Sequence, residues 1–548
     1  MTGASHSPLS VVAGRSNSHQ VTIRRPLIDG HLHIQSGRCA PLPLLWESLS
    51  LEEISKKELD DLADFANTVY TANFVSMSQI SRKSTIEIAD DAMEENDSVI
   101  FDSKIGDINI GIMIVMPMDM EFGHYEGYEG VKIYKFENGV RHYLKREWVP
   151  WADKRKGHRV NWNVSKYGLI ATPGGSSVIQ KFEATRWIPR TDETDKMYHD
   201  WERQRKETEI AAVRYPWRLM PMYHFDPRRY CGKGEGTENW QDVLAKVATT
   251  SNTGLYTGIK MYCSLGYQPL DDHPNLRYML DFYKDCALKK IPILVHNTPK
   301  GMVTHDREFY YYHHKANHSH LIEGGDSWLD FFQKNHVHPD AWEKVLIQVN
   351  DLTLCLAHFG GDAWEQHTNW FFGKRWQKSW VSKLIGLLKN YENVYTDISY
   401  FMIKKYEKKF QNVLTENREI HDKILFGTDW FMTKIDGYGM HKFITETKAC
   451  LDNICDALNG GKEWRKNRSD PDVVDLWRKF TFDNPLRFYG LHQQEKIDNI
   501  AAAIKNNINI YYDEEIVKYN RRDIEINFNK GYRKLNKTIQ FYNRNNNS

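Results

Sequence analysis

Eight short apolar runs, each followed by a stretch with helical spacing, constrain the fold of this chain more than any other feature. The runs are PLIDGHLHI from Pro26, INIGIMIVMPMD from Ile108, WRLMPMYHFDPR from Trp217, TGLYTGIKMY from Thr253, IPILVHNT from Ile291, LTLCLAHFGG from Leu352, NVYTDIS from Asn393 and KILFGTDWF from Lys423. They are too continuously apolar for strands with one solvated face. They therefore predict strands that intervening helices bury on both faces.

Eight buried strands with helical crossovers predict an α/β fold, a (β/α)8 TIM barrel. Helical patterns lie between the runs, for example LEEISKKELDDLADFANTVYTANF from Leu51 and HPNLRYMLDFYKDCALKK from His273. A doubly wound open sheet is the competing fold. The glycine-rich phosphate turn that follows the first strand of such a sheet is missing here, so we expect the barrel.

The length of 548 residues leaves room for additions to one barrel. We expect an N-terminal tail over 1–26, the barrel over 27–495, an inserted subdomain over 125–215 after the second strand, and a C-terminal extension over 496–548. The extension is rich in asparagine, tyrosine and basic residues. Its composition is typical of a strand-forming appendage or a partly ordered tail.

The tract 125–215 contains VKIYKFENGVRHYLKREWV, two alternating runs joined at Asn138-Gly139, which is a strong β-hairpin signal. Insertions between a strand and the following helix leave a barrel on its catalytic side. We therefore expect this tract to cover the mouth of the barrel. An outward-facing interaction module is the alternative.

Composition excludes several classes of partner. Lysine plus arginine (73) nearly cancels aspartate plus glutamate (72), so no net field attracts nucleic acid or an anionic membrane. No run approaches the roughly 20 apolar residues that a membrane span needs, and the first 20 residues lack the apolar core of a signal peptide. The seven cysteines are scattered without a CxxC pair, which favours a reducing compartment. We expect a cytoplasmic protein.

A polar residue stands at the C-terminal end of every predicted strand. These residues are His31 and His33 on the first strand, Asp119 on the second, Asp226 on the third, Lys260 on the fourth, His296 on the fifth, His358 on the sixth, Asp397 on the seventh and Asp429 on the eighth. In a parallel barrel these ends meet at one mouth. Because residues i and i+2 of a strand share a face, His31 and His33 both reach inward. Imidazoles with a carboxylate are the ligands expected for zinc or a related divalent metal, with a position left open for water.

This ordered set, HxH then His, His and Asp, resembles the amidohydrolase superfamily of metal-dependent hydrolases. The phrases GIKMYCSLGYQPLDD from Gly258, VYTDISY from Val394, ILFGTDW from Ile424 and DNPLRFYGL from Asp483 are similar to its amidohydrolase-related branch, which includes decarboxylases and lactonases. The resemblance covers about Leu27 to Leu491, apart from the inserted tract. It implies a metal held by His31, His33, His296 and Asp429, with His358 beside the substrate.

Other polar residues have more than one interpretation. Lys260 can anchor an anionic substrate or serve the fold, or it can be carboxylated and bridge two metals, as the resemblance to binuclear members allows. Arg228 and its neighbour Arg229 could clamp a carboxylate bidentately, although loop arginines are usually solvated. Asp119, Asp226 and Asp397 are interpreted as loop caps or as groups that orient the histidines. The histidine-dense stretch at 310–320 is interpreted as a solvated loop.

We expect hydrolysis of an amide, lactone or other ester bond of a small molecule by a metal-activated water. A divalent metal lowers the pKa of bound water from about 15.7 to about 7. Asp429 then takes the proton and returns it to the leaving group, while His358 polarises the substrate carbonyl. One divalent ion is favoured, with Zn²⁺ the first choice; two ions fit if Lys260 is carboxylated.

Two other functions are open. The same residues could support a metal-dependent decarboxylase, because a metal that stabilises an oxyanion also stabilises the carbanion-like state left by departing carbon dioxide. A catalytically silent binding scaffold, in which the insertion and the extension do the work, is the third function. The expected partner is a small-molecule substrate, with no nucleic acid and no membrane, and assembly into a homo-oligomer is left open.

Overall fold

The structure is a computed structural model. It describes residues 26–34, 83–98, 110–119, 128–137, 140–150, 170–171, 177–183, 201–230, 239–247, 254–271, 276–299, 333–364, 375–401, 403–430, 432–435, 438–466, 468, 470, 472–511 and 521–546. The helix expected from Leu51, the stretch 310–320 and the tail 1–25 lie outside these ranges.

Each of the eight apolar runs contains a strand, and all of these strands pair in parallel. Three strands form one sheet in the order β1 (Leu27–Leu32), β2 (Ile110–Val115) and β7 (Leu219–Pro221). Six strands form the other, in the order β13 (Ile424–Leu425), β12 (Val394–Asp397), β11 (Leu354–Leu356), β10 (Ile293–Val295), β9 (Ile259–Met261) and β8 (Tyr223–His224). The expected α/β architecture with parallel strands is confirmed.

Backbone hydrogen bonds link the two sheets at both ends. Only Met222 separates β7 from β8, and its N–H donates to the carbonyl of Val115 on β2. On the other side, the N–H of Gly30 on β1 donates to Phe426 just after β13 at 2.9 Å, and the N–H of Asp429 donates to His31 at 2.8 Å. The first and last strands are therefore neighbours.

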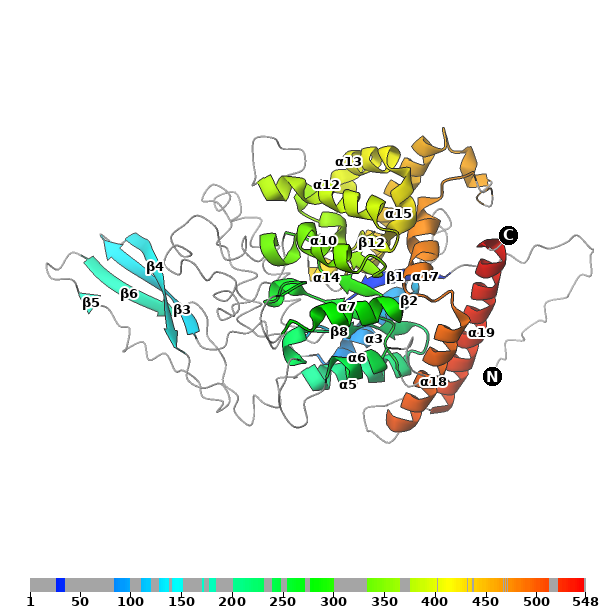
Figure 1. The fold of residues 1–548 in the computed structure, drawn as a ribbon, viewed down its shortest axis with the longest axis horizontal. Helices are drawn as coiled ribbons and strands as arrows, with labels where there is room; N and C mark the ends of the chain where they lie inside the picture. The colour runs from blue at the N-terminus through cyan, green and yellow to red at the C-terminus, as the bar shows by residue number, and fades with distance from the viewer. Residues whose placement is uncertain are drawn as a thin grey trace, which may run out of the picture.

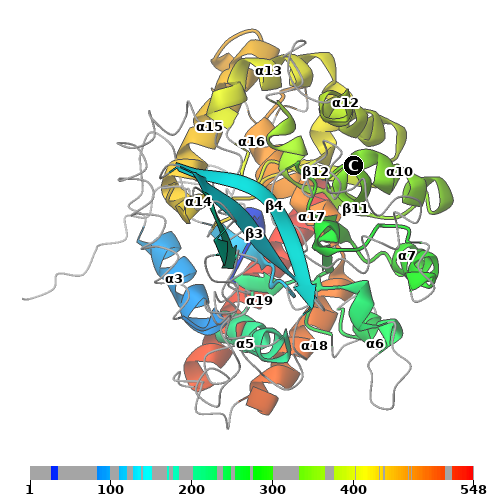
Figure 2. The same cartoon turned by 90° about the vertical axis from the view of Figure 1, so that its left-hand side faces the viewer.

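Helices surround the strands, as Figures 1 and 2 show. They are α3 (Thr85–Asp97), α5 (Trp201–Arg214), α6 (Trp240–Ala245), α7 (Met279–Leu288), α10 (Pro339–Gln348), α12 (Arg375–Asn390), α13 (Ile403–Glu416), α14 (Met432–Ile435), α15 (Met440–Leu458), α16 (Leu476–Arg478), α17 (Asn484–Phe488), α18 (Gln494–Tyr511) and α19 (Arg521–Asn546). The helix expected from His273 corresponds to α7. None of the described helices is long and apolar enough to cross a membrane.

The apolar character of the strands has the expected consequence. Every residue of β1, β9, β10 and β11 is buried, including polar residues such as Lys260. The helices begin at recognisable signals: Ser84 and Glu87 form a capping box at α3, and Pro339 occupies the first turn of α10. The buried polar side chains near the strand ends therefore need partners inside the protein.

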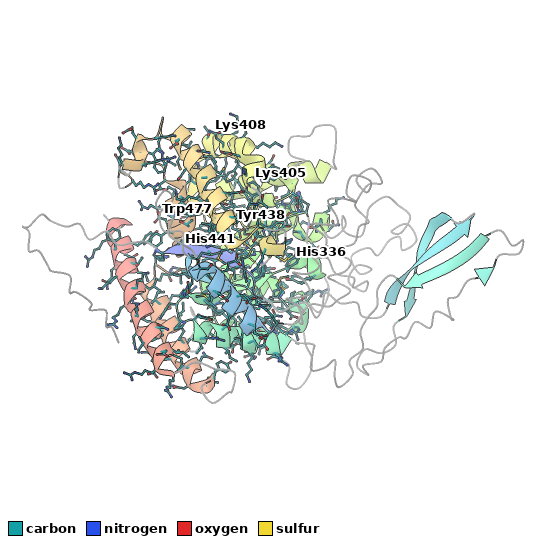
Figure 3. All side chains as sticks on the ribbon, turned by 180° about the vertical axis from the view of Figure 1, so that it is seen from behind. His336, Lys405, Lys408, Tyr438, His441 and Trp477 are labelled. Carbon is teal, nitrogen blue, oxygen red and sulfur yellow. The ribbon has the colours of Figure 1, made fainter. Side chains whose placement is uncertain are left out.

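The inserted tract contains a separate antiparallel sheet in the order β4 (Val140–Pro150), β3 (Tyr128–Glu137), β6 (Ser177–Glu183) and β5 (Ile170–Ala171). Glu137 pairs with Val140, so the expected hairpin around Asn138-Gly139 is confirmed. Figure 1 draws this sheet apart from the main body. His336 follows β10 in the chain. In Figure 3 it lies on the side of the body nearer to this antiparallel sheet. The end of the tract is α5, which packs against α3.

The C-terminal extension is helical where it is described, so the expectation of a strand-forming appendage is wrong. Helices α18 and α19 pack against the body, as Figure 1 shows. The ring of Phe528 lies 5.7 Å from that of Trp217, and a Cβ at Gly531 would be 2.7 Å from the Trp217 ring. Isoleucines at helical spacing, not strand spacing, face the core from α18.

Candidate metal centre

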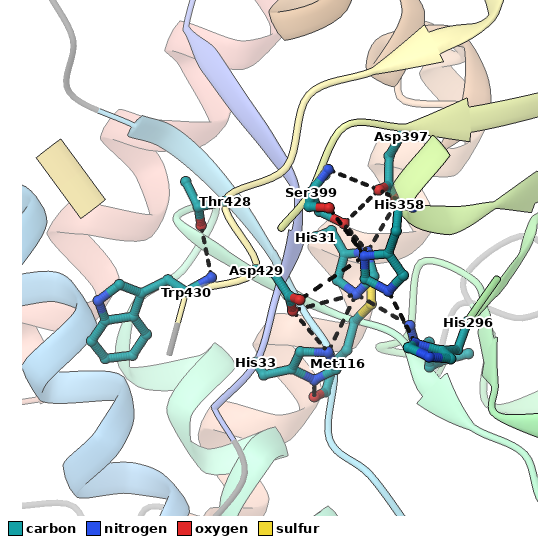
Figure 4. A network of polar contacts seen from close by, with 12 residues as sticks. His31, His33, Met116, His296, His358, Asp397, Ser399, Thr428, Asp429 and Trp430 are labelled. Carbon is teal, nitrogen blue, oxygen red and sulfur yellow. Dashed lines mark hydrogen bonds and ion pairs between the residues drawn. The ribbon is translucent and has the colours of Figure 1, made fainter. Parts of the chain in front are cut away.

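The ends of β1, β9, β10, β11, β12 and β13 bring the predicted site residues together (Figure 4). The nearest group is His31, His33 and Asp429, in which one ligand atom from each residue lies within 4.8 Å of the others. His33 Nε2 is 3.3 Å from His31 Nε2 and 3.3 Å from Asp429 Oδ1. Asp429 Oδ1 is 3.8 Å from His31 Nε2. All three side chains are buried.

A second group contains His31, His358 and Asp397. Asp397 Oδ2 lies 2.9 Å from His31 Nδ1. His358 Nδ1 lies 3.1 Å from the carbonyl oxygen of Ser399 and 3.0 Å from its Oγ. Asp397 is therefore placed to orient a histidine, as the sequence suggests, and Ser399 joins it.

The partners of the Nδ1 atoms indicate which nitrogen carries each ring proton. His33 Nδ1 faces the carbonyl oxygen of Met116 at 2.9 Å, and His358 Nδ1 faces that of Ser399. A carbonyl oxygen only accepts, so these rings donate from Nδ1. His31 Nδ1 donates to the Asp397 carboxylate in the same way. The Nε2 atoms of His31 and His33 consequently face each other as lone pairs beside a carboxylate.

Burial keeps these rings neutral. Removal from water lowers the pKa of His31 to about 4 and that of His358 to about 3, and it holds the pKa of His33 well below its ordinary value. For Asp397, burial favours the protonated form, but the interaction with His31, including its hydrogen bond, outweighs burial and holds the carboxyl pKa well below its usual range. Neutral imidazoles are the form of histidine that a divalent metal binds.

Lys260 lies fully buried in the same cluster, with Nζ 3.2 Å from His31 Nε2. Burial lowers the pKa of its ammonium to about 8, although Asp429 and Asp397 act against this shift. Its expected roles, an anchor for an anion, a residue that serves the fold or a lysine carboxylated between two metals, stay predictions.

His296 lies to one side of the His31–His33–Asp429 group, as Figure 4 shows. Its Nδ1 is 3.0 Å from His358 Nε2, and its Nε2 is 3.2 Å from the hydroxyl of Tyr262, whose ring stacks on it at 4.1 Å. Because His358 Nδ1 carries the proton, His358 offers a lone pair at Nε2. The expected role of His358 in polarising a substrate carbonyl needs a proton on Nε2, so this role stays a prediction.

Arg229 behaves differently from the expected clamp. Arg229 makes a bidentate ion pair with Asp119, at 2.7 Å from Nε to Oδ2 and 2.9 Å from Nη2 to Oδ1. The Arg229 guanidinium group therefore already binds a carboxylate of the protein, Asp119. Arg228 lies in the short 3₁₀ helix Pro227–Arg229, and its side chain is outside the described part of the structure.

Asp29 and Thr428 fasten the first strand to the last one. Asp29 accepts hydrogen bonds from the Thr428 N–H at 3.0 Å, the Thr428 hydroxyl at 2.5 Å and the His31 N–H at 3.1 Å. Burial raises the pKa of Asp29 to about 7 despite these bonds. Sequence reasoning missed this pair, although the phrases IDGHLH and FGTDW place both residues next to predicted ligands.

Two more residues of the site were missed, and both had a signal in the sequence. Ser399 is two residues after Asp397, and Tyr262 is two residues after Lys260, so each continues the face of a predicted strand end. Asp429 and His358 also have left-handed backbone angles, with φ of 51° and 69°. Such conformations often occur at functional sites.

No protein-family model and no curated protein matches the sequence. Solved structures are similar at low identity. A 5-carboxyvanillate decarboxylase from Novosphingobium aromaticivorans with bound manganese is 10% identical over 86% of this chain and 98% of that one, with a TM-score of 0.38. A protein from Lactobacillus casei named as a metal-dependent hydrolase is 12% identical over 88% and 99%, with a TM-score of 0.32.

A protein from Acinetobacter baumannii named as a 2-pyrone-4,6-dicarboxylic acid hydrolase is 13% identical over 52% of this chain and 78% of that one, with a TM-score of 0.30. These structures are members of the amidohydrolase superfamily, the group that the sequence resembles.

Proposed function

We propose that this protein is a metal-dependent hydrolase that cleaves an amide, lactone or other ester bond of a small molecule in the mouth of a (β/α)8 barrel. The backbone hydrogen bonds at Met222 and between β1 and the segment after β13 support a ring of eight strands. The observation that carries the proposal is the meeting of two imidazole lone pairs with a carboxylate. His31 Nε2 and His33 Nε2 are 3.3 Å apart, and Asp429 Oδ1 lies beside both.

Such an arrangement fits a cation. Two facing lone pairs and a carboxylate repel one another unless a positive charge lies among them. The Lys260 ammonium lies 3.2 Å from one of these atoms, His31 Nε2, at the side of the group. Buried nitrogen and oxygen donors of this kind suit Zn²⁺. His31, His33 and Asp429 would hold the ion, with His296 as the proposed fourth ligand. When bound, the ion would supply Lewis acidity and a water of lowered pKa.

The protein's own residues would supply the remaining steps. The Asp429 carboxylate is ionised when it binds a cation, so it can accept a proton from the attacking water and release it to the leaving group. Lys260 adds a positive charge beside the ligands and favours an anionic substrate. The neutral histidines stay in place because their Nδ1–H groups are bonded to fixed acceptors.

Metal content and product analysis test the proposal together. After a chelator has removed any bound metal, Zn²⁺, Mn²⁺ or Fe²⁺ should bind the protein at about one ion per chain. The added ion should restore activity toward a panel of lactones, esters and amides. Carbon dioxide release from aromatic acids, with no hydrolysis, would assign the decarboxylase instead. His33→Asn should lose the metal, whereas His441→Asn, on α15 and labelled in Figure 3, should keep it. If the protein binds none of these ions, both the hydrolase and the decarboxylase proposals are rejected, and the binding scaffold is favoured.

A further inference from the structure

Asp397 is surrounded by hydrogen-bond donors. Its Oδ2 accepts from His31 Nδ1 at 2.9 Å. Its Oδ1 accepts from the backbone N–H of His358 at 2.9 Å, and from both the N–H and the hydroxyl of Ser399 at 3.0 and 2.5 Å. The carboxylate is fully buried. An ionised carboxylate only accepts hydrogen bonds, so each of these contacts has a fixed direction.

The fixed direction extends beyond Asp397. The Ser399 hydroxyl donates its proton to Asp397, so its oxygen acts as an acceptor toward His358 Nδ1 and His31 Nδ1, each at 3.0 Å. His358 Nε2 is then a lone pair that accepts from His296 Nδ1 at 3.0 Å. His296 Nε2 in turn accepts from the Tyr262 hydroxyl at 3.2 Å. The hydrogen bonds run one way, from Tyr262 to Asp397.

We propose that Asp397 is the positioning residue of the site: together with the Ser399 carbonyl oxygen, which also accepts from His358 Nδ1 at 3.1 Å, its carboxylate sets the direction of this chain and holds the ring protons of His31, His358 and His296 on Nδ1. The metal-binding consequence rests on the proposed function, because a ring protonated at Nδ1 offers Nε2 to a cation. Asp397 itself needs no contact with substrate in this role.

In the competing arrangement, Tyr262, and not Asp397, sets the direction of this series of hydrogen bonds. If the Tyr262 hydroxyl were decisive, loss of that oxygen would let His296 and His358 reverse their protons. Asp397→Asn tests the opposite end, since the amide can donate from Nδ2 to His31 Nδ1 and force the His31 proton onto Nε2. His33 is an internal control, because its Nδ1 donates to Met116 and not to this chain.

The first measurement uses the metal-free native chain labelled with ¹⁵N-histidine. Long-range ¹H–¹⁵N spectra, assigned with single His→Gln variants, should show His31, His358 and His296 as Nδ1–H tautomers. A His31 or His358 ring protonated at Nε2 would overturn the proposal. This result does not depend on turnover or on bound metal, so it is distinguishable from a failure of the proposed hydrolase.

The variants separate the two ends of the chain. In Asp397→Asn we expect His31 to change to the Nε2–H tautomer, His33 to stay unchanged, and zinc affinity to fall about 10- to 100-fold. In Tyr262→Phe, which keeps the ring stack on His296, we expect all tautomers to stay. Reversal in Tyr262→Phe, or an unchanged His31 in a folded Asp397→Asn, would reject the proposal. If Asp397→Asn does not fold, the native spectra and Tyr262→Phe still decide.

Discussion

Gly427 lies directly against His31: a Cβ at position 427 would be 2.6 Å from the His31 Cβ and 2.9 Å from the Ser399 Cβ. Real Cβ atoms do not approach so closely, so a side chain at 427 must displace the strand that carries the first two predicted ligands. The GTD sequence after β13 thus has a steric reason for its glycine as well as a chemical reason for its aspartate.

Gly427→Ala should therefore damage the metal centre. Overpacking of this kind costs about 1–3 kcal/mol of stability, and a displaced His31 should weaken zinc binding further. Urea unfolding and zinc titration measure the two effects. Gly386→Ala is the matched control, because a Cβ placed at position 386 would meet nothing within 4 Å outside its own helix turn, and alanine should stabilise α12 by about 0.5–1 kcal/mol. Unchanged zinc affinity in Gly427→Ala would show that the strands yield without moving His31.

The sequence predicted the strands and the polar residues at their ends because both signals are local. A run such as IPILVHNT contains the apolar strand and the histidine that ends it, so only the parallel arrangement had to be inferred. Partnerships across the fold were not predictable in this way. Nothing local to Asp29 indicates that Thr428, 399 positions away, donates to it twice.

The C-terminal extension shows how composition can mislead. Its asparagines and tyrosines are poor helix formers, and they obscured the spacing of Ile497, Ile500, Ile504 and Ile508, which is helical. Contacts with the body outweigh the weak propensity, since these isoleucines are all buried. Tertiary packing decides the structure here, and one sequence does not reveal the surface against which a segment packs.

Asp429→Asn should lose far more activity than metal. Asparagine keeps an oxygen of similar size beside His33 Nε2 but removes the carboxylate that carries a proton, so kcat should fall about 10²- to 10⁴-fold. Zinc analysis and initial rates on the same samples separate the two losses. Asp281→Asn, on the exposed surface of α7, is the control. Near-normal turnover in a zinc-replete Asp429→Asn enzyme would reject the proton-carrying role.

The four-stranded sheet of the inserted tract should act on substrate binding rather than on the metal. The tract leaves the body after β2, on the side where the strands end. Replacing residues 128–183 with a short glycine-serine linker should raise KM and leave zinc content unchanged, because the candidate ligands lie on β1, β10 and β13 ends. If turnover of the true substrate is unaffected by the deletion, the tract is an interaction module and not a cover.

Lys496 gives the stability of the protein a pH dependence that is separate from the metal centre. It is buried on α18, and its Nζ donates to the carbonyl of Thr257 at 2.7 Å. Burial lowers its pKa from 10.5 to about 7. Between these two values the unfolded chain holds a proton that the folded one has released. The free energy of unfolding therefore rises with pH across this window, by up to about 1.4 kcal/mol per pH unit.

Lys496→Met should remove that rise. At pH 7 the variant should be more stable than the native protein by about 1–3 kcal/mol, since a buried cation costs more than the lost hydrogen bond to Thr257. The advantage should shrink toward pH 10, where the native lysine is neutral and still bonds Thr257. Urea unfolding at pH 7, 8 and 9 checks this, with Lys530→Met on the exposed surface of α19 as control. Parallel pH profiles for the native protein and Lys496→Met would mean that Lys496 keeps its proton when folded.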